Sequence, residues 1–137
     1  MRKTKEVHLQ ADSVRWFNNE YCLKHHNPRC MIFAVQNEMA SQIAGAIKAK
    51  VPKALWSIID KTVQIVVSKA VTFGFKKGVS DLIVIIPKKV LFVELKTEIG
   101  KQREEQKNFE DIVTNLGFSY YIIRDLENFK KIINKYI

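Results

Sequence analysis

Two adjacent apolar runs restrict the fold of this chain more than any other feature of its sequence. Residues 81–86 and 90–95 are rich in β-branched side chains, and a Pro-Lys-Lys segment separates them. This pattern predicts a β-hairpin, because proline supplies the fixed φ angle that a turn needs. Both runs are apolar at successive positions, so we expect a sheet that is covered on both faces.

The rest of the chain predicts a mixed α/β fold in the order α-β-α-α-β-β-α-β-α. A β-branched run at residues 63–67 would suit a strand, but apolar residues around it recur at helical spacing, so we predict a helix there. The amphipathic helix at residues 101–116 has a stripe of Phe109, Ile112, Val113 and Leu116, and Gly117 suits its C-terminal cap. The other predicted elements are helices near 5–23, 38–50, 53–70 and 126–137, and strands near 30–35 and 118–123.

Length and charge indicate one basic domain. The 137 residues fit a single domain spanning 1–137, and 47% hydrophobic residues can supply a core. The net charge of +9 indicates a polyanion as partner. A solvated basic surface without a partner explains the charge equally well. A membrane is a weaker explanation, because the lysines are scattered and no run of 18 apolar residues occurs.

The two cysteines give little sign of a metal site. Cys22 and Cys30 do not form a C-x-x-C pair, and His25 and His26 lie between them. Adjacent histidines point in different directions, so we do not expect a Cys/His site. We expect reduced cysteines in a cytoplasmic protein.

The predicted hairpin gathers three charged residues at its open end. If Pro87 and Lys88 form the turn, Asp81 faces Glu94, and residues directly opposite point to the same face. Lys96 is two residues beyond Glu94 and shares that face. A shift of one residue in the register would separate Asp81 from the other two.

Two carboxylates this close repel each other unless a cation lies between them. Their hard oxygen ligands suit Mg²⁺ or Mn²⁺, which polarises a phosphate and activates a water, while a lysine can stabilise developing charge. The pattern therefore predicts phosphodiester hydrolysis. The alternative is an ordinary salt bridge of Glu94 with Lys96 or Lys76 at a solvated strand end, because D…ExK triplets are common by chance.

Gln106 is a further candidate for the site. It lies three residues before Phe109, on the apolar face of its helix, where an amide needs a partner. Either it contacts the site or the scissile phosphate, or it lies at the wet margin of the core.

These residues resemble the VRR-NUC family of the PD-(D/E)xK nuclease superfamily. The resemblance rests on the G-x-x-D of residues 78–81, the E-x-K of residues 94–96, the following Gln106 and Gly117, and more loosely on residues 6–10. Ser80 departs from the family, which usually has proline before the aspartate. The resemblance implies a restriction-endonuclease-like core, a mixed sheet flanked by helices.

The resemblance also implies residue roles. Asp81, Glu94 and the backbone carbonyl of Leu95 would bind the metal, with Lys96 as the catalytic lysine. Gln106 would support the site, and Glu6 would be an outer acidic residue from the first helix. Lysines and an arginine that flank the site are expected to contact DNA: Lys76, Lys77, Lys101, Arg103 and Lys107.

The predicted function is a metal-dependent endonuclease acting on DNA. The resemblance implies a phage or bacterial protein similar to Holliday-junction resolvases, acting on branched DNA as a homodimer. The apolar helix from Leu55 to Ala70 is a candidate interface, although burial in the core explains it equally well. The alternative function is a non-catalytic nucleic-acid-binding protein that keeps the fold. A third class, a structural partner protein, would leave the charge of +9 unexplained.

Overall fold

The chain divides into two compact units. The computed structural model describes residues 2–24 and 29–137, so His25 and His26 lie outside the described residues. The first unit combines Met1–Val35 with Gly78–Ile137, and the second is Gln36–Lys77. Each unit is described by itself below. The expectation of a single domain over the whole chain stays a prediction.

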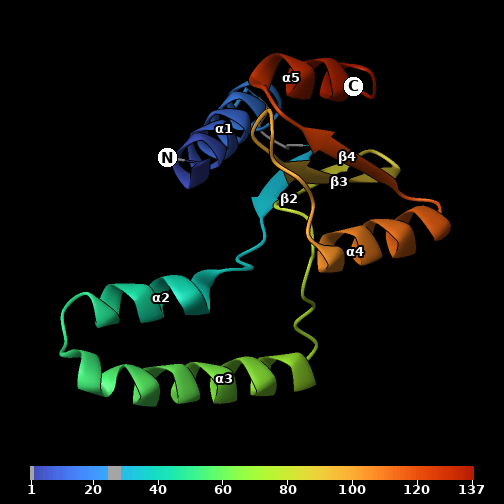
Figure 1. Cartoon of the computed structure of the whole chain (residues 1–137). Helices are drawn as coiled ribbons and strands as arrows, with labels where there is room; N and C mark the ends of the chain where they lie inside the picture. The colour runs from blue at the N-terminus through green and yellow to red at the C-terminus, as the bar shows by residue number, and fades with distance from the viewer. Residues whose placement is uncertain (1, 25–28) are drawn as a thin grey trace. The chain divides into compact units, whose positions relative to one another are not determined.

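The predicted order of elements is confirmed (Figure 1). Helix α1 continues into a π-helical turn at Asn18–Cys22, and a 3-10 turn at Lys53–Leu55 precedes α3. Residues 63–67 are helical, as their surroundings indicated. The elements are α1 (Arg2–Phe17), β1 (Met31–Ala34), α2 (Met39–Lys48), α3 (Trp56–Thr72), β2 (Leu82–Ile86), β3 (Lys89–Leu95), α4 (Glu104–Asn115), β4 (Ser119–Ile123) and α5 (Leu126–Asn134).

The four strands form one mixed sheet in the order β1-β2-β3-β4. Strands β1, β2 and β3 pair antiparallel, and β4 runs parallel to β3. Ile86 pairs with Lys89 across the two-residue turn, where Lys88 adopts a positive φ of 64°. The predicted hairpin register is therefore confirmed, and it sets which side chains share a face.

Helices α1 and α5 cover one face of the sheet (Figure 1). The strands contribute alternate residues such as Leu82, Val84 and Val93 to a core that also contains Phe17 of α1 and Phe129 of α5. All five side chains are fully buried. This layer holds the hairpin in place.

The other face of the sheet is covered only in part. Helix α4 packs over β3 and β4, where Phe109 meets Phe92 with ring centroids 5.4 Å apart. Beside it, Met31 and Phe33 of β1 and Ile85 of β2 are 56%, 40% and 39% exposed. Within the described residues of the first unit, the prediction of a sheet covered on both faces is therefore wrong for this half, because α4 spans only two strands.

The predicted stripe of α4 is also only partly correct. Val113 is buried and Phe109 is half-buried, whereas Ile112 and Leu116 are 46% and 69% exposed. Among the described residues, α4 packs against β4 and, through Phe109, against Phe92 of β3, and the outer edge of its stripe is exposed.

The second unit is a pair of contacting helices, α2 and α3. Ala44 is its only buried hydrophobic side chain, and α3 has no buried residue over its 17 positions. Every residue of Gln36–Lys77 is described, so this exposure belongs to the whole unit. In the described part of the chain, no helix has the length and apolar character needed to cross a bilayer.

Candidate active site

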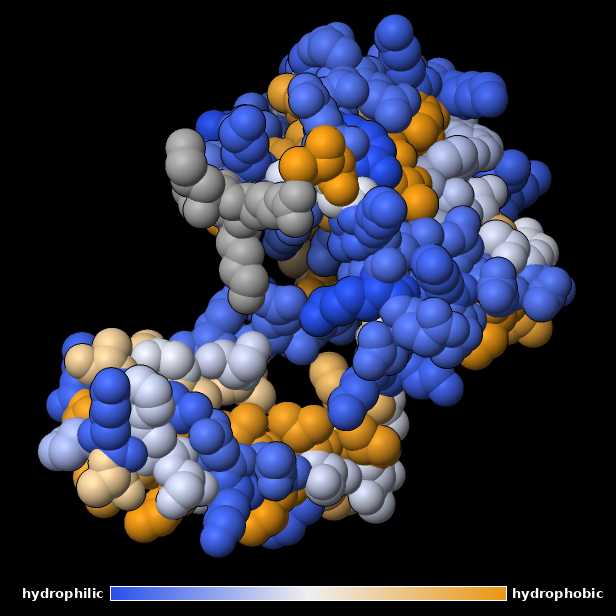
Figure 2. Space-filling model, in the orientation of Figure 1, coloured by the Kyte–Doolittle hydropathy of each residue, from blue (hydrophilic) through white to orange (hydrophobic). Residues whose placement is uncertain are grey.

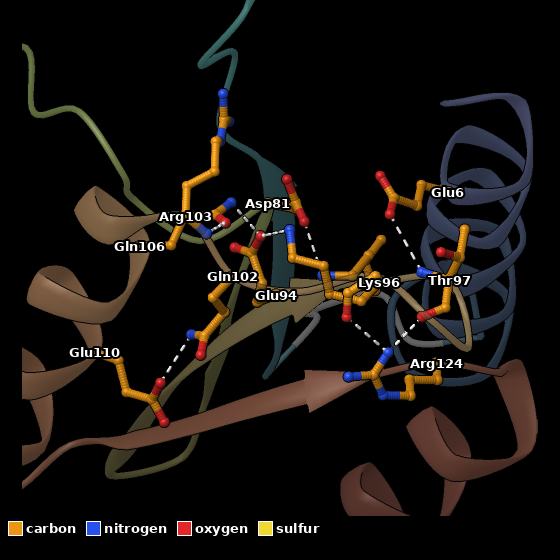
Figure 3. Close-up of polar contacts among 12 residues, drawn as sticks. Glu6, Asp81, Glu94, Lys96, Thr97, Gln102, Arg103, Gln106, Glu110 and Arg124 are labelled. Atoms are coloured by element: carbon orange, nitrogen blue, oxygen red, sulfur yellow. Dashed lines mark hydrogen bonds and ion pairs between the residues drawn. The ribbon is translucent and has the colours of Figure 1, made fainter. Parts of the chain in front are cut away.

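Asp81 and Glu94 meet at one end of the β2–β3 hairpin, as the register predicted (Figure 3). Asp81 immediately precedes β2, and its Oδ2 accepts a hydrogen bond of 2.7 Å from the backbone N–H of Leu95. Its own carbonyl accepts 2.9 Å from the N–H of Val35, at the end of β1. These backbone contacts fix the position of Asp81 on both sides.

Lys96 forms a buried ion pair with Glu94. Its Nζ lies 2.5 Å from Glu94 Oε1, and the two side chains are 10% and 0% exposed. The backbone N–H of Lys96 also donates 2.9 Å to the carbonyl of Ile123 in β4. The alternative of a salt bridge at a solvated rim is therefore wrong, because both partners lie inside the protein.

The surroundings of the Glu94 carboxylate act on its pKa in opposite directions. Its pKa is raised from 4.5 to about 7, first by burial and second by the negative charge of Asp81. Hydrogen bonds and charge from Lys96, and a hydrogen bond from Tyr120, act in the opposite direction. Buried carboxyl groups with shifted pKa values are typical of functional sites. An additional cation would offset the repulsion between Glu94 and Asp81 and favour the ionised form of both.

Gln106 contacts the site, so its placement at a wet margin is excluded. It is 4% exposed, and its Nε2 donates to Glu94 Oε1. Its Oε1 accepts 2.9 Å from the backbone N–H of Arg103 at the start of α4. Both ends of the amide are satisfied, and α4 is thereby joined to Glu94.

Tyr120 is a residue that sequence reasoning missed. Its hydroxyl donates 3.4 Å to Glu94 Oε2, and burial together with the charge of Glu94 raises the pKa of the phenol. Phe92 of β3 pairs with Tyr120 of β4 in the parallel ladder, so Tyr120 lies on the same face as Glu94. Its alternation with Ile122 in β4 was a signal, but parallel register cannot be deduced without the turn geometry of a hairpin.

Glu6 lies on the other side of Lys96. Its Oε1 accepts 3.2 Å from the backbone N–H of Thr97, directly after the lysine. Arg124, which sequence reasoning also missed, donates from one guanidinium nitrogen to the carbonyls of Thr97, Glu98 and Gly100. A pocket of about 420 Å³ with Glu6, Lys96 and Arg124 in its wall opens here. The loop after Lys96 is therefore fixed from two directions.

Gly78 explains why the G-x-x-D spacing matters. Its φ is +79°, a conformation that side chains rarely adopt. A Cβ atom there would come within 2.2 Å of the backbone oxygen of Glu105 in α4. Gly78 thus lets the segment leading to Asp81 pass against the first turn of α4. Ser80, in the position usual for proline, is fully buried with its Oγ 3.1 Å from the Leu82 carbonyl oxygen, to which it donates.

The predicted DNA-contacting cations are all exposed. Lys101, Arg103 and Lys107 lie in the loop before α4 and in its first turns, close in sequence to Gln106. Lys76 and Lys77 end the second unit. Their contact with nucleic acid stays a prediction.

The residues at the hairpin end fit a divalent cation by their chemistry. Among the described residues, no group of three or more His, Cys, Asp or Glu side chains is placed to hold a metal ion. Glu6 therefore does not join Asp81 and Glu94 in a three-carboxylate cluster. Two carboxylates and a backbone carbonyl remain, and Mg²⁺ commonly uses one or two carboxylates together with waters and substrate phosphate. Burial and the charge of Asp81 raise the pKa of Glu94 in spite of Lys96, so the two carboxylates can accommodate an additional cation.

Neither a family model nor a curated protein matches the sequence. A solved structure described as a VRR_NUC domain matches the fold with a TM-score of 0.55 and 17% identity, over 97% of this chain and 98% of that chain. The chain has the VRR-NUC fold. The match spans nearly all of both chains, so it includes the α2–α3 unit as well as the sheet.

The VRR-NUC fold agrees with the arrangement that the sequence resemblance implied. Asp81, Glu94 and Lys96 come from the hairpin, Gln106 from the next helix and Glu6 from the first helix. The structure brings Glu94, Lys96 and Gln106 into direct contact. It connects Asp81 to them through the backbone N–H of Leu95, and Glu6 through the backbone N–H of Thr97.

Proposed function

We propose that this chain is a divalent-metal-dependent endodeoxyribonuclease of the PD-(D/E)xK type. The observation that carries the proposal is the buried Glu94–Lys96 pair beside Asp81 at the end of the hairpin. An ion pair kept only for stability gains little from burial, because desolvation offsets the attraction between the charges. A VRR-NUC fold around these residues supports a nuclease.

The position of each site residue supports one role in this reaction. Asp81, Glu94 and the carbonyl of Leu95 would hold a Mg²⁺ or Mn²⁺ ion. When bound, that ion would polarise a phosphate and provide a nucleophile from water at neutral pH. Lys96 would stabilise the charge that develops on the phosphate, in a buried position where electrostatic contacts are strong. Gln106 and Tyr120 orient the two oxygens of Glu94.

The proposed substrate is DNA, and branched DNA in particular. The net charge of +9 supports a phosphate backbone as partner, because lysines and arginines gain affinity by releasing counterions. A homodimer would place two sites around a two-fold axis, as symmetric cleavage of a junction requires. A DNA substrate of this kind agrees with the cytoplasm of a bacterial or phage-infected cell.

A panel of labelled DNAs tests the proposal. Junction, flap, plain duplex and single-stranded substrates are incubated with the protein and Mg²⁺ or Mn²⁺, or with a chelator. We expect cleavage that needs the metal and that Asp81→Asn abolishes. Cleavage in the presence of the chelator, or full cleavage by Asp81→Asn, would contradict a metal-dependent mechanism.

The same panel of DNAs distinguishes the nuclease from the alternative function. A non-catalytic nucleic-acid-binding protein would bind the substrates and leave them intact with every metal. Such a protein has no physical need for a buried lysine and two carboxylates at one point, so the geometry favours the nuclease.

A further inference from the structure

An exposed tryptophan lies where the chain turns from α2 into α3. Trp56 is the first residue of α3 and is 37% exposed, although tryptophan is highly buried in most proteins. Leu55, directly before it, is 44% exposed. Hydrophobic and hydrophilic residues lie side by side on the surface of the α2–α3 unit (Figure 2). An aromatic ring is therefore offered to solvent in a part of the chain that the proposed nuclease site does not use.

Two lysine side chains lie against the ring of Trp56. The Nζ atom of Lys48, the last residue of α2, is 5.5 Å from the ring centroid, and that of Lys53 in the 3-10 turn is 5.8 Å from it. Lys50, in the loop between these two lysines, is exposed. An ammonium group this close to an indole ring is attracted to its face. These four residues are called here the turn surface: Lys48, Lys50, Lys53 and Trp56.

The turn surface has an excess of positive charge. Gln36–Lys77 contains seven lysines and two acids, a net charge of +5. One of the acids, Asp60, pairs with Lys48. Within the part of the chain that the structure describes, Lys50 and Lys53 form no ion pair. A partner that complements this surface carries negative charge and has a flat group that can lie on an indole ring.

We propose that the turn surface binds a single-stranded segment of DNA, with a base stacked on Trp56 and phosphates at Lys50 and Lys53. Lysines along the backbone and an aromatic ring under a base are how proteins hold single strands without reading their sequence. In a duplex each base is already stacked on its neighbours, so only an unpaired base can lie on the ring. The inference rests on the proposed function for the choice of DNA, and it names a second contact of that substrate, at unpaired nucleotides.

An anionic membrane would also attract lysines and a tryptophan, but α3 does not suit one. A helix that lies on a membrane has one apolar face opposite a polar face. The exposed apolar residues Ile58, Val66 and Val71 of α3 are instead spread around the helix. At 100° per residue, Val66 lies about 80° from Ile58, and Val71 lies about 140° from both. The charge and the ring therefore favour a nucleic acid strand.

The two tryptophans of the chain allow a direct test by fluorescence. Trp16 lies in the first unit, where its ring packs against Tyr21 and Phe129. Trp16→Phe leaves Trp56 as the only tryptophan, and Trp56→Phe leaves Trp16. Each full-length variant is titrated with single-stranded oligothymidine and with a duplex, without a divalent metal. We expect the single strand to quench the emission of Trp16→Phe, the duplex to quench it less, and neither to quench Trp56→Phe.

Binding affinities test the lysines and the ring separately. Trp56→Ala should weaken the binding of oligothymidine by roughly 5- to 150-fold, as the loss of one stacked base does, and Trp56→Phe should restore most of it. Lys50→Ala/Lys53→Ala should reduce the slope of log K against log salt by about 1.4, at ~0.7 per phosphate of a single strand. Lys61→Ala/Lys69→Ala is the matched control, because both lysines are exposed on α3 and lie about 140° around the helix from Trp56. Its slope should equal that of the wild type.

Several results would overturn the inference. These are equal quenching in the two single-tryptophan variants, no quenching in Trp16→Phe, a duplex that quenches as strongly as the single strand, or equal slopes for the two lysine variants. A change in Trp56 emission with vesicles of anionic lipid but not with oligothymidine would assign the surface to a membrane instead. If Trp16→Phe does not fold, the difference between the wild type and Trp56→Phe gives the signal of Trp56. Binding with the expected changes in a protein that cleaves no DNA would contradict the nuclease proposal alone.

Discussion

The ammonium of Lys96 lies 2.5 Å from Oε1 of Glu94, and neither side chain is more than 10% exposed. The same oxygen also accepts from Gln106, while Tyr120 donates to the other oxygen. Glu94 is therefore surrounded by donors of its own chain. A cation that binds Glu94 must share the carboxylate with these donors. The site should therefore be sensitive to single substitutions.

Lys96→Ala should slow cleavage more than it weakens metal binding. Removing one electrostatic donor from a preorganised site typically costs about 10²–10³-fold in rate. The affinity for Mg²⁺ should rise, because a positive charge beside the carboxylates has gone. Single-turnover cleavage at saturating Mg²⁺ and calorimetric titration measure the two effects. Lys131→Ala, at an exposed lysine of α5, is the control. An unchanged rate in Lys96→Ala would exclude Lys96 from catalysis.

Asp81→Asn should lower the pKa of Glu94. The charge of Asp81 is one of the two causes that raise this pKa to about 7, and asparagine keeps the shape without the charge. The Glu94 carboxyl can be followed by carbon NMR in protein without metal. A pKa that stays near 7 would mean that burial alone sets it.

The stability of the metal-free protein should fall as the pH rises from about 4.5 to 7. Glu94 has a higher pKa in the folded state than in the unfolded chain, so the folded state binds more protons in this window. The full effect is on the order of 3 kcal/mol, from ~1.4 kcal/mol per pKa unit. Urea unfolding at pH 5 and pH 8 measures it.

Glu94→Gln is the control for this pH effect. Glutamine cannot ionise, so the variant should lose this part of the pH dependence. Mg²⁺ added at pH 8 should stabilise the wild type more than the variant. Equal pH profiles for the two proteins would show that Glu94 titrates normally.

Gln106→Leu should destabilise the fold and slow cleavage together. It removes the donor to Glu94 and the acceptor for the Arg103 N–H. A buried polar group left without a partner costs about 1–3 kcal/mol. Gln106→Glu keeps the acceptor for Arg103 but faces Glu94 with a second carboxyl group, so its stability should recover more than its rate. If Gln106→Glu recovers its stability and its cleavage rate to the same extent, the amide does not orient Glu94.

DNA binding should weaken steeply with salt. Each phosphate contact lowers the slope of log K against log salt by about 0.9 for duplex DNA. The triple variant Lys101→Ala/Arg103→Ala/Lys107→Ala should flatten the slope, measured by anisotropy with Ca²⁺ in place of Mg²⁺. A parallel triple variant of lysines on α5 and its end, at Lys130, Lys131 and Lys135, gives the comparison. Identical slopes in both variants would place the DNA elsewhere.

The hairpin could be predicted from the sequence because its register depends on local features. Pro87 fixes the turn, and a period of two then determines that Asp81 and Glu94 share a face. Gln106 could also be found, because an amide on an apolar helix face needs a partner. These arguments need only a few neighbouring residues.

Contacts between distant segments could not be predicted in this way. Tyr120 reaches Glu94 only because β4 pairs in parallel with β3, and Arg124 reaches the loop after Lys96 from the end of the same strand. The exposed half of the sheet was also missed, because an apolar strand has the same sequence whether or not a helix covers it.

The insertion of Gln36–Lys77 between β1 and β2 has a consequence for the order in which the chain folds. Ala34 pairs with Leu82, 48 positions later, whereas Ile86 and Lys89 are 3 apart. Closing a longer loop costs more entropy, so distant pairs form more slowly. Strand β1 should therefore join last, onto a nucleus of β2 and β3. The strands that carry Asp81, Glu94 and Lys96 would then be the first part of the sheet to be protected from hydrogen exchange during refolding.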